Sequence, residues 1–300
     1  MKVIKPTTIT PSSIVSSSLT ETVPAWSSVT TYAIGTQVYD GLYGVYQAVT
    51  SNTNKQPRNN PLDWSYVRPS NGWALFDSEA STVSTGTTTI TFKIATGTLE
   101  GIALLNLVAN TVAIKVTDGV SGPIIYEASQ SLTSNTFFDW YEYFFRDTDT
   151  ALIRTQAVFT DLPLLNYTNT YTEVTITGTG TVSIGTCTFG TMSEIGSAEY
   201  GVTSGITDYS VKETDEFGQT TFVRRAFSKR MTGRVLIDNK QLNSVQRTLY
   251  SLRAVPALWI ASQNPDLEEA LVVFGYYKDF TTDISYPNFS YCSLEIEGLI

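Results

Sequence analysis

Short stretches in which apolar and polar residues alternate recur along most of the chain. Clear examples occupy residues 88–94 and 111–116, and the turn residues Asp118-Gly119 follow the second one. Alternation with a period of two places successive side chains on opposite faces of a strand, and turn residues end it. We therefore expect a mainly β protein. Other segments with strand character are 35–39, 45–49, 102–107, 171–176, 222–225, 233–237, 259–260, 270–274 and 291–296.

One segment near the C-terminus has the periodicity of a helix instead. Asp238 is expected to cap this helix, with Gln241 as its capping-box partner, and Pro256 is expected to end it. A helix with one apolar face is expected to pack on a β-sheet. The apolar residues that recur at helical spacing are Leu242, Val245, Leu249 and Leu252.

Changes in composition divide the chain into four parts. Residues 1–23 are rich in Ser, Thr and Pro and predict an N-terminal arm or linker that packs on a neighbour. Residues 24–69 predict a small aromatic-rich β module, because large aromatic side chains can fill a small core. Regular short strands over 70–200 predict a jelly-roll β-sandwich, and residues 201–300 predict a β-sheet or barrel with one packed helix.

The charged residues and the missing histidine exclude some classes of function. The formal net charge is −9, and the chain has no histidine. Nucleic-acid binding needs a basic stripe, so the acidic balance argues against that partner. Histidine is the commonest general base and metal ligand, so we expect no enzyme, no cofactor and no metal site. The acidic pairs Asp215-Glu216 and Glu268-Glu269 are expected on turns and solvated strand edges, and a calcium site built from Asp63 and Asp118-Gly119 is the alternative to a metal-free chain.

Cysteine usage and hydropathy add two expectations. Cys187 and Cys292 stand in strand-like apolar contexts and predict two small buried side chains, with a disulfide between them as the alternative. No run approaches the roughly 20 apolar residues that span a bilayer. The polar start Ile4-Lys5-Pro6-Thr7 also lacks the apolar core of a signal peptide. We expect synthesis in a cytoplasm without insertion into a membrane.

The aromatic-rich segment carries an ordered series of residues: Ala25-Trp26, Tyr32, Gly35, Val38, Tyr46-x-Ala48, Pro57 and Trp64. This series resembles the chitin-binding type 5/12 group of carbohydrate-binding modules. The resemblance covers about 40 residues and implies a small module that contacts host surface glycans. The candidate carbohydrate-binding residues are Trp26, Tyr32, Tyr43, Tyr46, Trp64 and Tyr66.

The chain departs from that group just after the Tyr-x-Ala. The group carries an exposed aromatic pair there, where this chain has Val49 and Thr50. Sugar faces bind aromatic faces through apolar contact, so Tyr43, Tyr66 or Trp73 would have to serve as substitute platforms. The alternative is a structural or protein-contacting module whose matched aromatic residues form a core.

Two further resemblances cover the rest of the chain. The stretch that begins at Val182-Ser183-Ile184-Gly185 and continues through Gly190 and Gly196 to Tyr200-Gly201 is similar to the closing strands of galactose-binding-type jelly rolls. In the last third, residues 208–210, 212–218, 225–231, 252–259 and 290–298 resemble the tail-tube and distal-tail family of bacteriophages, whose subunits form rings.

These resemblances imply a structural virion protein of a phage tail tip or baseplate. It would form a ring with copies of itself, contact other phage tail proteins, and present its modules for docking or host glycan adhesion. The alternative is a stand-alone glycan-binding adhesin or a tail-fibre-like receptor-binding protein. The basic cluster is the candidate assembly interface, with a solvated strand face as the alternative. Its members are Arg224, Arg225, Lys229, Arg230 and Arg234.

Overall fold

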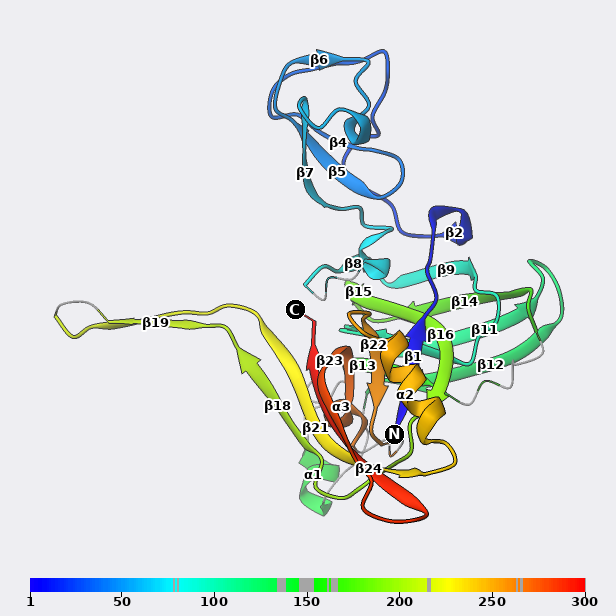
Figure 1. The fold of residues 1–300 in the computed structure, drawn as a ribbon. Helices are drawn as coiled ribbons and strands as arrows, with labels where there is room; N and C mark the ends of the chain where they lie inside the picture. Colours follow the sequence, from blue (N-terminus) through cyan, green and yellow to red (C-terminus); the bar gives the residue numbers. More distant parts are fainter. Residues whose placement is uncertain are drawn as a thin grey trace.

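The computed structural model confirms a mainly β protein (Figure 1). One long curled sheet forms the centre, a second sheet packs on part of it, and a small module and a long hairpin project from this body. The paired strands in the described residues run antiparallel, as expected for strands joined by short turns. The structure describes residues 1–77, 79, 81–133, 139–145, 154–160, 162, 167–214, 217–262, 264 and 267–299.

The central sheet has ten strands in the order β13-β10-β16-β1-β22-β23-β24-β21-β17, with β18 also paired to β21. Strands from residues 101–194 thus share one sheet with strands from residues 197–298, so the sheet crosses the boundary expected at residue 200. Its strands are β1 (Lys2–Pro6), β10 (Gly101–Leu105), β13 (Gln156–Phe159), β16 (Thr186–Glu194), β17 (Ser197–Ala198), β18 (Thr203–Asp208), β21 (Phe227–Asp238), β22 (Ala257–Ile260), β23 (Val272–Asp283) and β24 (Phe289–Gly298).

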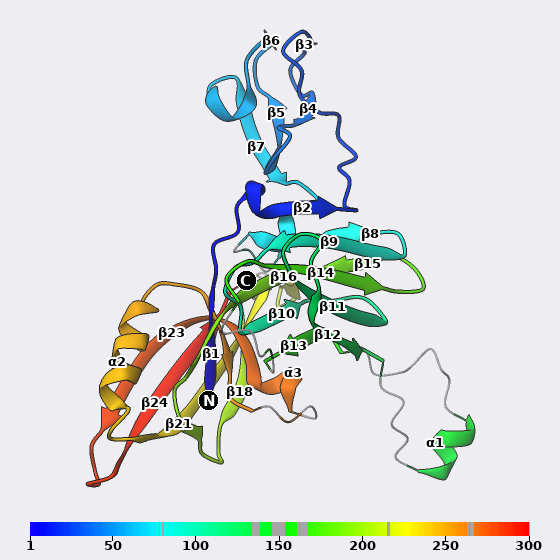
Figure 2. The same ribbon diagram turned by 90° about the vertical axis from the view of Figure 1, so that its right-hand side faces the viewer.

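A five-stranded sheet packs on one end of the central sheet and completes a β-sandwich there (Figure 2). The largest core lies between these two sheets, and Phe92, Ile114 and Phe189 are fully buried in it. The sandwich expected within residues 70–200 is therefore present. The strands of the five-stranded sheet are β2 (Ile14–Ser17), β9 (Thr89–Ala95), β11 (Thr111–Asp118), β12 (Ile124–Ser131) and β14 (Thr170–Thr177). A separate small pair at the rim of the sandwich consists of β8 (Ser84–Gly86) and β15 (Val182–Ile184).

The first residues differ from the expected arm. β1 lies inside the central sheet, paired with β16 on one side and β22 on the other, and β2 is an edge strand of the sandwich. Val3 and Ile4 are both buried, but in different cores on opposite faces of the sheet. A strand that is covered on both faces shows no alternation of apolar and polar residues, so the pattern gave no sign of it.

The expected helix is present as α2 (Leu242–Ser251), and its residues Val245 and Leu249 face a second core. The capping prediction was wrong. Asp238 is the last residue of β21, and its Oδ1 accepts a hydrogen bond from the Lys240 N–H, so it begins a turn rather than the helix. Gln241 occupies the N-cap position without a side-chain cap bond.

The aromatic module projects from the end of the sandwich near β2 (Figures 1 and 2). The strands expected at residues 35–39 and 45–49 are confirmed and pair as a hairpin, and Asp40 Oδ1 closes its turn by accepting hydrogen bonds from the N–H groups of Leu42, Tyr43 and Gly44. Its elements are β3 (Thr31–Tyr32), β4 (Gln37–Tyr39), β5 (Gly44–Ala48), β6 (Asn52–Thr53) and β7 (Trp64–Pro69); short 3-10 turns occupy Pro11–Ser13, Pro57–Asn59 and Ala74–Phe76.

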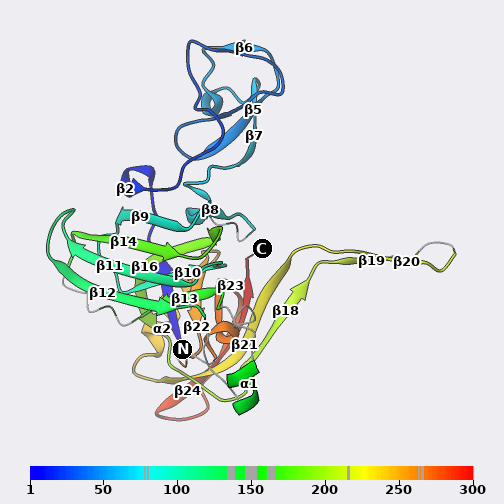
Figure 3. The same ribbon diagram turned by 180° about the vertical axis from the view of Figure 1, so that it is seen from behind.

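A long hairpin extends from β18 and β21 well beyond the edge of the body (Figure 3). Its outer part consists of β19 (Val211–Thr214) and β20 (Thr220–Val223). We call residues 203–230 the projecting hairpin. The remaining helices are α1 (Trp140–Phe145), which stands away from the sheets, and α3 (Glu268–Leu271). α3 occupies the beginning of the strand expected at 270–274, and β23 starts only at Val272.

Both cysteines are buried and free, so the disulfide alternative is wrong. Cys187 lies in the sandwich core and Cys292 in the core under α2. Burial raises the pKa of the Cys187 thiol, which makes it an unreactive apolar side chain. None of the helices in the described part of the chain has the length and apolar character needed to cross a membrane.

Candidate functional site

Part of the predicted carbohydrate-binding set forms the core of the aromatic module. The Tyr32 and Trp64 rings meet edge to face with centroids 5.3 Å apart, and both side chains are buried. Trp64 Nε1 donates to the Lys55 carbonyl oxygen at 2.8 Å, and the Ser27 N–H donates to Tyr32 Oη at 2.7 Å. Trp26 packs against this cluster. Tyr32 and Trp64 therefore form the core of the module and are unavailable to a sugar, whereas Trp26 is half-buried at its edge.

Tyr46 and Tyr66 form an outer aromatic pair. They are cross-strand neighbours on β5 and β7, with ring centroids 5.6 Å apart. Gly44 makes room for them, because a Cβ at Gly44 would lie 2.7 Å from the Tyr66 ring. Tyr66 is 56% exposed and is the most accessible of the predicted aromatic residues.

Tyr43 is covered rather than open. The Arg58 guanidinium carbon lies 4.0 Å from the centroid of the Tyr43 ring, and Trp73 meets that ring edge to face with centroids 4.5 Å apart. At the position of the family's aromatic pair, Thr50 Oγ1 donates to Asp63 Oδ1 at 2.6 Å. Of the substitute platforms, the structure leaves Tyr66 as the exposed ring.

A polar clamp at the base of the module was not foreseen from the sequence. The Glu21 carboxylate accepts two hydrogen bonds from the Arg68 guanidinium, at 2.7 and 3.1 Å, and one from the Asn71 N–H at 2.9 Å. The Asn71 side-chain amide in turn donates to the carbonyl oxygens of Thr20 and Thr85. The clamp thus joins both connections of the module to β8 of the sandwich. Its members stand up to 65 residues apart in the chain, so no sequence spacing indicates it.

We expect Glu21→Gln to weaken this junction. Burial raises the pKa of Glu21, but the hydrogen bonds from Arg68, Asn71 and Val23 outweigh it and hold the pKa at about 2, below the ordinary 4.5. Because the pKa is lowered in the folded protein, the charged carboxylate stabilises the fold at pH values above its ordinary pKa of 4.5. This contribution is lost as the pH falls from 4.5 towards 2. Arg68 is partly exposed, so the contribution is roughly 1–2 kcal/mol.

The measurement is denaturant unfolding at neutral pH and across that acid range, with limited proteolysis of the module connections. Glu21→Gln should unfold at lower denaturant concentration and show a flatter acid dependence. Glu295→Gln is the control, because it removes an exposed carboxylate whose pair with Lys278 contributes little. Equal stability of Glu21→Gln and the wild type at neutral pH would show that the clamp does not stabilise the junction.

The predicted basic cluster is divided by the geometry of β21. Arg224 and Arg225 lie in the exposed segment between β20 and β21. Arg230 and Arg234 share one face of β21, while Lys229 points to the other, because side chains alternate along a strand. Arg234 already interacts with residues of its own chain. Its guanidinium lies 4.3 Å from the centroid of the Tyr291 ring and 4.0 Å from the Glu199 carboxylate.

The projecting hairpin exposes apolar side chains along most of its length. Phe217 is 90% exposed and Phe222 is 72% exposed, and Ile206, Val223 and Phe227 are also exposed. A two-stranded hairpin is marginally stable in water by itself. Contiguous exposed apolar surface is the kind of feature through which proteins in general bind one another. The basic residues of this region were predicted as a site from the sequence, whereas its aromatic residues Phe217 and Phe222 were not.

A concave groove of about 490 Å³ is lined by residues of β10, β13, β16, β21 and β23 of the central sheet. Short α3 lies across it and connects its two sides. Glu269 accepts hydrogen bonds from Thr155 just before β13, and Lys229 Nζ on β21 donates to the Glu269 carbonyl oxygen at 3.1 Å. The apolar side chains that line this groove are Leu105, Ala226, Phe227, Val272, Phe274 and Leu299.

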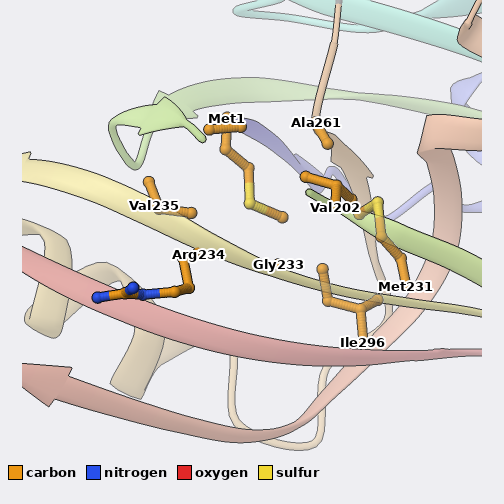
Figure 4. A pocket seen from close by; sticks show the side chains of 9 residues that line it. Met1, Val202, Met231, Gly233, Arg234, Val235, Ala261 and Ile296 are labelled. Atoms are coloured by element: carbon orange, nitrogen blue, oxygen red, sulfur yellow. The ribbon is translucent and has the colours of Figure 1, made fainter. Parts of the chain in front are cut away.

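A second hollow, under β18 and β21, is too small for a ligand (Figure 4). Its volume is about 10 Å³, roughly that needed by one water, and its walls are apolar. Val202, Met231 and Ile296 line it, and Figure 4 shows these side chains with that of Met1. It is a small packing gap.

Chemistry built on acidic pairs finds no support in the described residues. Glu269 is bonded to Thr155, and Asp63 is held by Thr50 and Lys55. The part of the chain that the structure describes contains no group of three acidic or cysteine residues placed to hold a metal ion. Asp215, Glu216 and the side chain of Glu268 lie outside the described residues.

No protein-family model matches this sequence, and no curated protein matches it.

Proposed function

We propose that this protein is a structural component of a bacteriophage tail tip or baseplate that assembles into a ring of identical copies. The observation that carries the proposal is the projecting hairpin. It leaves the body at the edge of the central sheet and carries exposed aromatic residues, including Phe217 and Phe222. A side chain of this kind gains about 1.5–3 kcal/mol when it is removed from water, so a partner is the natural way to bury it.

The distribution of charge supports a neighbour made of the same chain. Arg224, Arg225 and Arg230 are exposed at the root of the hairpin, in a protein whose formal net charge is −9. A basic root that meets the acidic body of a second copy would be attracted to it. A hairpin that binds a different surface of its neighbour makes a head-to-tail contact, and such contacts close into rings when the rotation permits.

The aromatic module would then be displayed at the periphery. It projects from the body, and the Glu21–Arg68 clamp fixes its base. Tyr66 is its exposed ring, and weak contacts of one ring with host glycans gain strength when many copies act together. The same exposed Tyr66 favours the second candidate function, a glycan-binding adhesin that acts as a single chain.

Native mass spectrometry of the purified protein tests the assembly. We expect the wild type to form a closed oligomer and the Phe217→Ser/Phe222→Ser variant to shift towards monomer, because the variant loses the apolar contacts of the hairpin. Tyr200→Ser is the matched control, since Tyr200 is fully exposed and lies outside the hairpin. Circular dichroism would establish that the double variant keeps its fold.

A wild type that stays monomeric at high concentration would contradict the ring. If that monomer also bound chitin or cell-wall glycans, and Tyr66→Ala abolished the binding, the adhesin would be the better account. An oligomer that persists unchanged in the double variant would show that the hairpin is not its contact.

A further inference from the structure

The described part of the connection between β12 and β13 contains α1, a six-residue helix made almost wholly of aromatic residues. Trp140 is 77% exposed, and the other aromatic side chains of α1 are exposed as well. The helix stands away from both sheets (Figure 2). A helix this short is marginal by itself, and one that is apolar all round normally lies buried. The exposed rings are those of Trp140, Tyr141, Tyr143, Phe144 and Phe145.

The concave groove is suited to such a helix in size and character. Its volume of about 490 Å³ lies in the range of roughly 300–1,000 Å³ that proteins use to enclose small ligands. Leu105, Val272 and Phe274 form an apolar floor contributed by β10 and β23. The groove has room for more than one aromatic ring.

The charges of the two surfaces are complementary. Residues 139–145 carry two acidic residues and no basic one. Lys229 lines the groove and forms no ion pair with a carboxylate among the described residues; its Nζ donates instead to the backbone carbonyl oxygen of Glu269. Arg224 and Arg225 directly precede the lining residues Ala226 and Phe227. The lining also contains the acidic Glu269, whose carboxylate is already bonded to Thr155, so Lys229 is the groove cation that an acidic aromatic helix would meet beside the apolar floor.

We propose that α1 of one copy inserts into the concave groove of a second copy. The proposal rests on the proposed assembly and names its contact. Phe227 belongs both to the groove lining and to the inner part of the projecting hairpin, so the groove and the hairpin of one copy form a continuous surface on which α1 of the neighbour would lie. Burying three aromatic side chains removes about 150–250 Å² each, which is less than the about 800 Å² per partner of a stable interface. The hairpin supplies the remainder.

Trp140 is a natural reporter of this contact. It is the most exposed tryptophan of the chain, so quenching of its fluorescence by acrylamide follows its accessibility. We expect quenching to fall and the emission to move to shorter wavelength as the protein concentration rises through the assembly range. The Trp140→Phe variant keeps an apolar ring, and it should assemble without showing these changes. The other four tryptophans, all buried or half-buried, are Trp26, Trp64, Trp73 and Trp259.

Two variants test the two sides of the contact. Phe144→Ser on the helix and Lys229→Glu in the groove are each expected to weaken association about tenfold or more, as central interface residues do. Lys240→Glu makes the same change of charge on an exposed turn outside the groove and should associate like the wild type. Thermal unfolding of each variant would show that the fold is retained.

The outcomes separate this inference from the proposed function. If the wild type forms rings while Trp140 stays equally quenchable and Phe144→Ser associates normally, the helix contact is wrong and the ring stands. If Trp140 is protected at all concentrations, α1 occupies the groove of its own chain, and the inference is again overturned. If the wild type remains monomeric throughout, both proposals fail.

Discussion

Replacing Gly190 with alanine is expected to destabilise the protein by about 3 kcal/mol or more. Gly190 lies on β16 where this strand pairs with β1, and a Cβ there would come within 1.9 Å of the Lys5 carbonyl oxygen. A backbone atom cannot move aside as a flexible side chain can, so β1 and β16 must separate locally. The Ile4 side chain also packs over Gly190 and its neighbour Gly101.

Denaturant unfolding would measure this loss, and Gly180→Ala provides the control. A Cβ at Gly180 would meet no atom within 4 Å, so this change should stay within about 0.5 kcal/mol of the wild type. A Gly190→Ala variant as stable as Gly180→Ala would mean that the β1–β16 seam tolerates displacement. The pairing of β1 would then contribute little to the fold.

The second large effect is expected at Trp259, on the other side of the same seam. Trp259 is fully buried on β22, its Nε1 donates to the Gly275 carbonyl oxygen at 3.1 Å, and its ring meets Tyr277 edge to face. Trp259→Ala removes the ring and leaves a cavity, which costs about 3–5 kcal/mol in comparable cores. Trp259→Phe keeps most of the packing and loses the hydrogen bond, so a smaller cost of about 1–2 kcal/mol is expected.

Calorimetry of these variants would check the prediction, with Tyr200→Ala as an exposed aromatic control. Trp259→Ala should lower the melting temperature strongly, Trp259→Phe moderately, and Tyr200→Ala hardly at all. An equal and small effect of all three changes would contradict the assignment of Trp259 to the core.

Calorimetry of Gly190→Ala reports on cooperativity. If the sandwich and the C-terminal strands melt separately in this variant, the pairing of β1 is what makes them one cooperative unit.

The seam has a consequence for the proposed assembly. The hairpin leaves the central sheet from β18 and β21, and the aromatic module is clamped to the sandwich; continuous strand pairing through β16, β1, β22, β23 and β24 connects the two regions. Strands of this same sheet line the groove. In the proposed assembly, the contacts and the displayed module would therefore belong to one continuous body.

The half-buried strands were the most predictable part of the fold. Residues 88–94, 111–116 and 171–176 alternate clearly because one face of each strand meets the sandwich core and the other meets water. The helix face at Val245 and Leu249 was equally clear, since its period reports burial on a single side. Local periodicity records the number of buried faces, and these elements each have one.

Elements with two buried faces, or with none, show a weaker periodicity of apolar residues in the sequence. β1 has buried residues towards both faces and was read as an arm. Asp238 was read as a helix cap because its local sequence fits one, but pairing with Phe289 keeps it in β21. Among the site residues, Tyr32 and Trp64 were predicted to bind carbohydrate, with a core role as the alternative, and they are buried in the module core. The cover of Arg58 over Tyr43 depends on a contact between separate loops.

The sequence by itself determined the β class, the hairpin of the aromatic module, the helix α2 and the burial of both cysteines, because each of these follows from the order of neighbouring residues. Only the tertiary structure decided that β1 joins two regions into one sheet, that Glu21, Arg68 and Asn71 form a clamp, and that Lys229 faces a groove while Arg230 does not. These features arise where segments distant in the chain meet, and their energies depend on distances that local patterns do not encode.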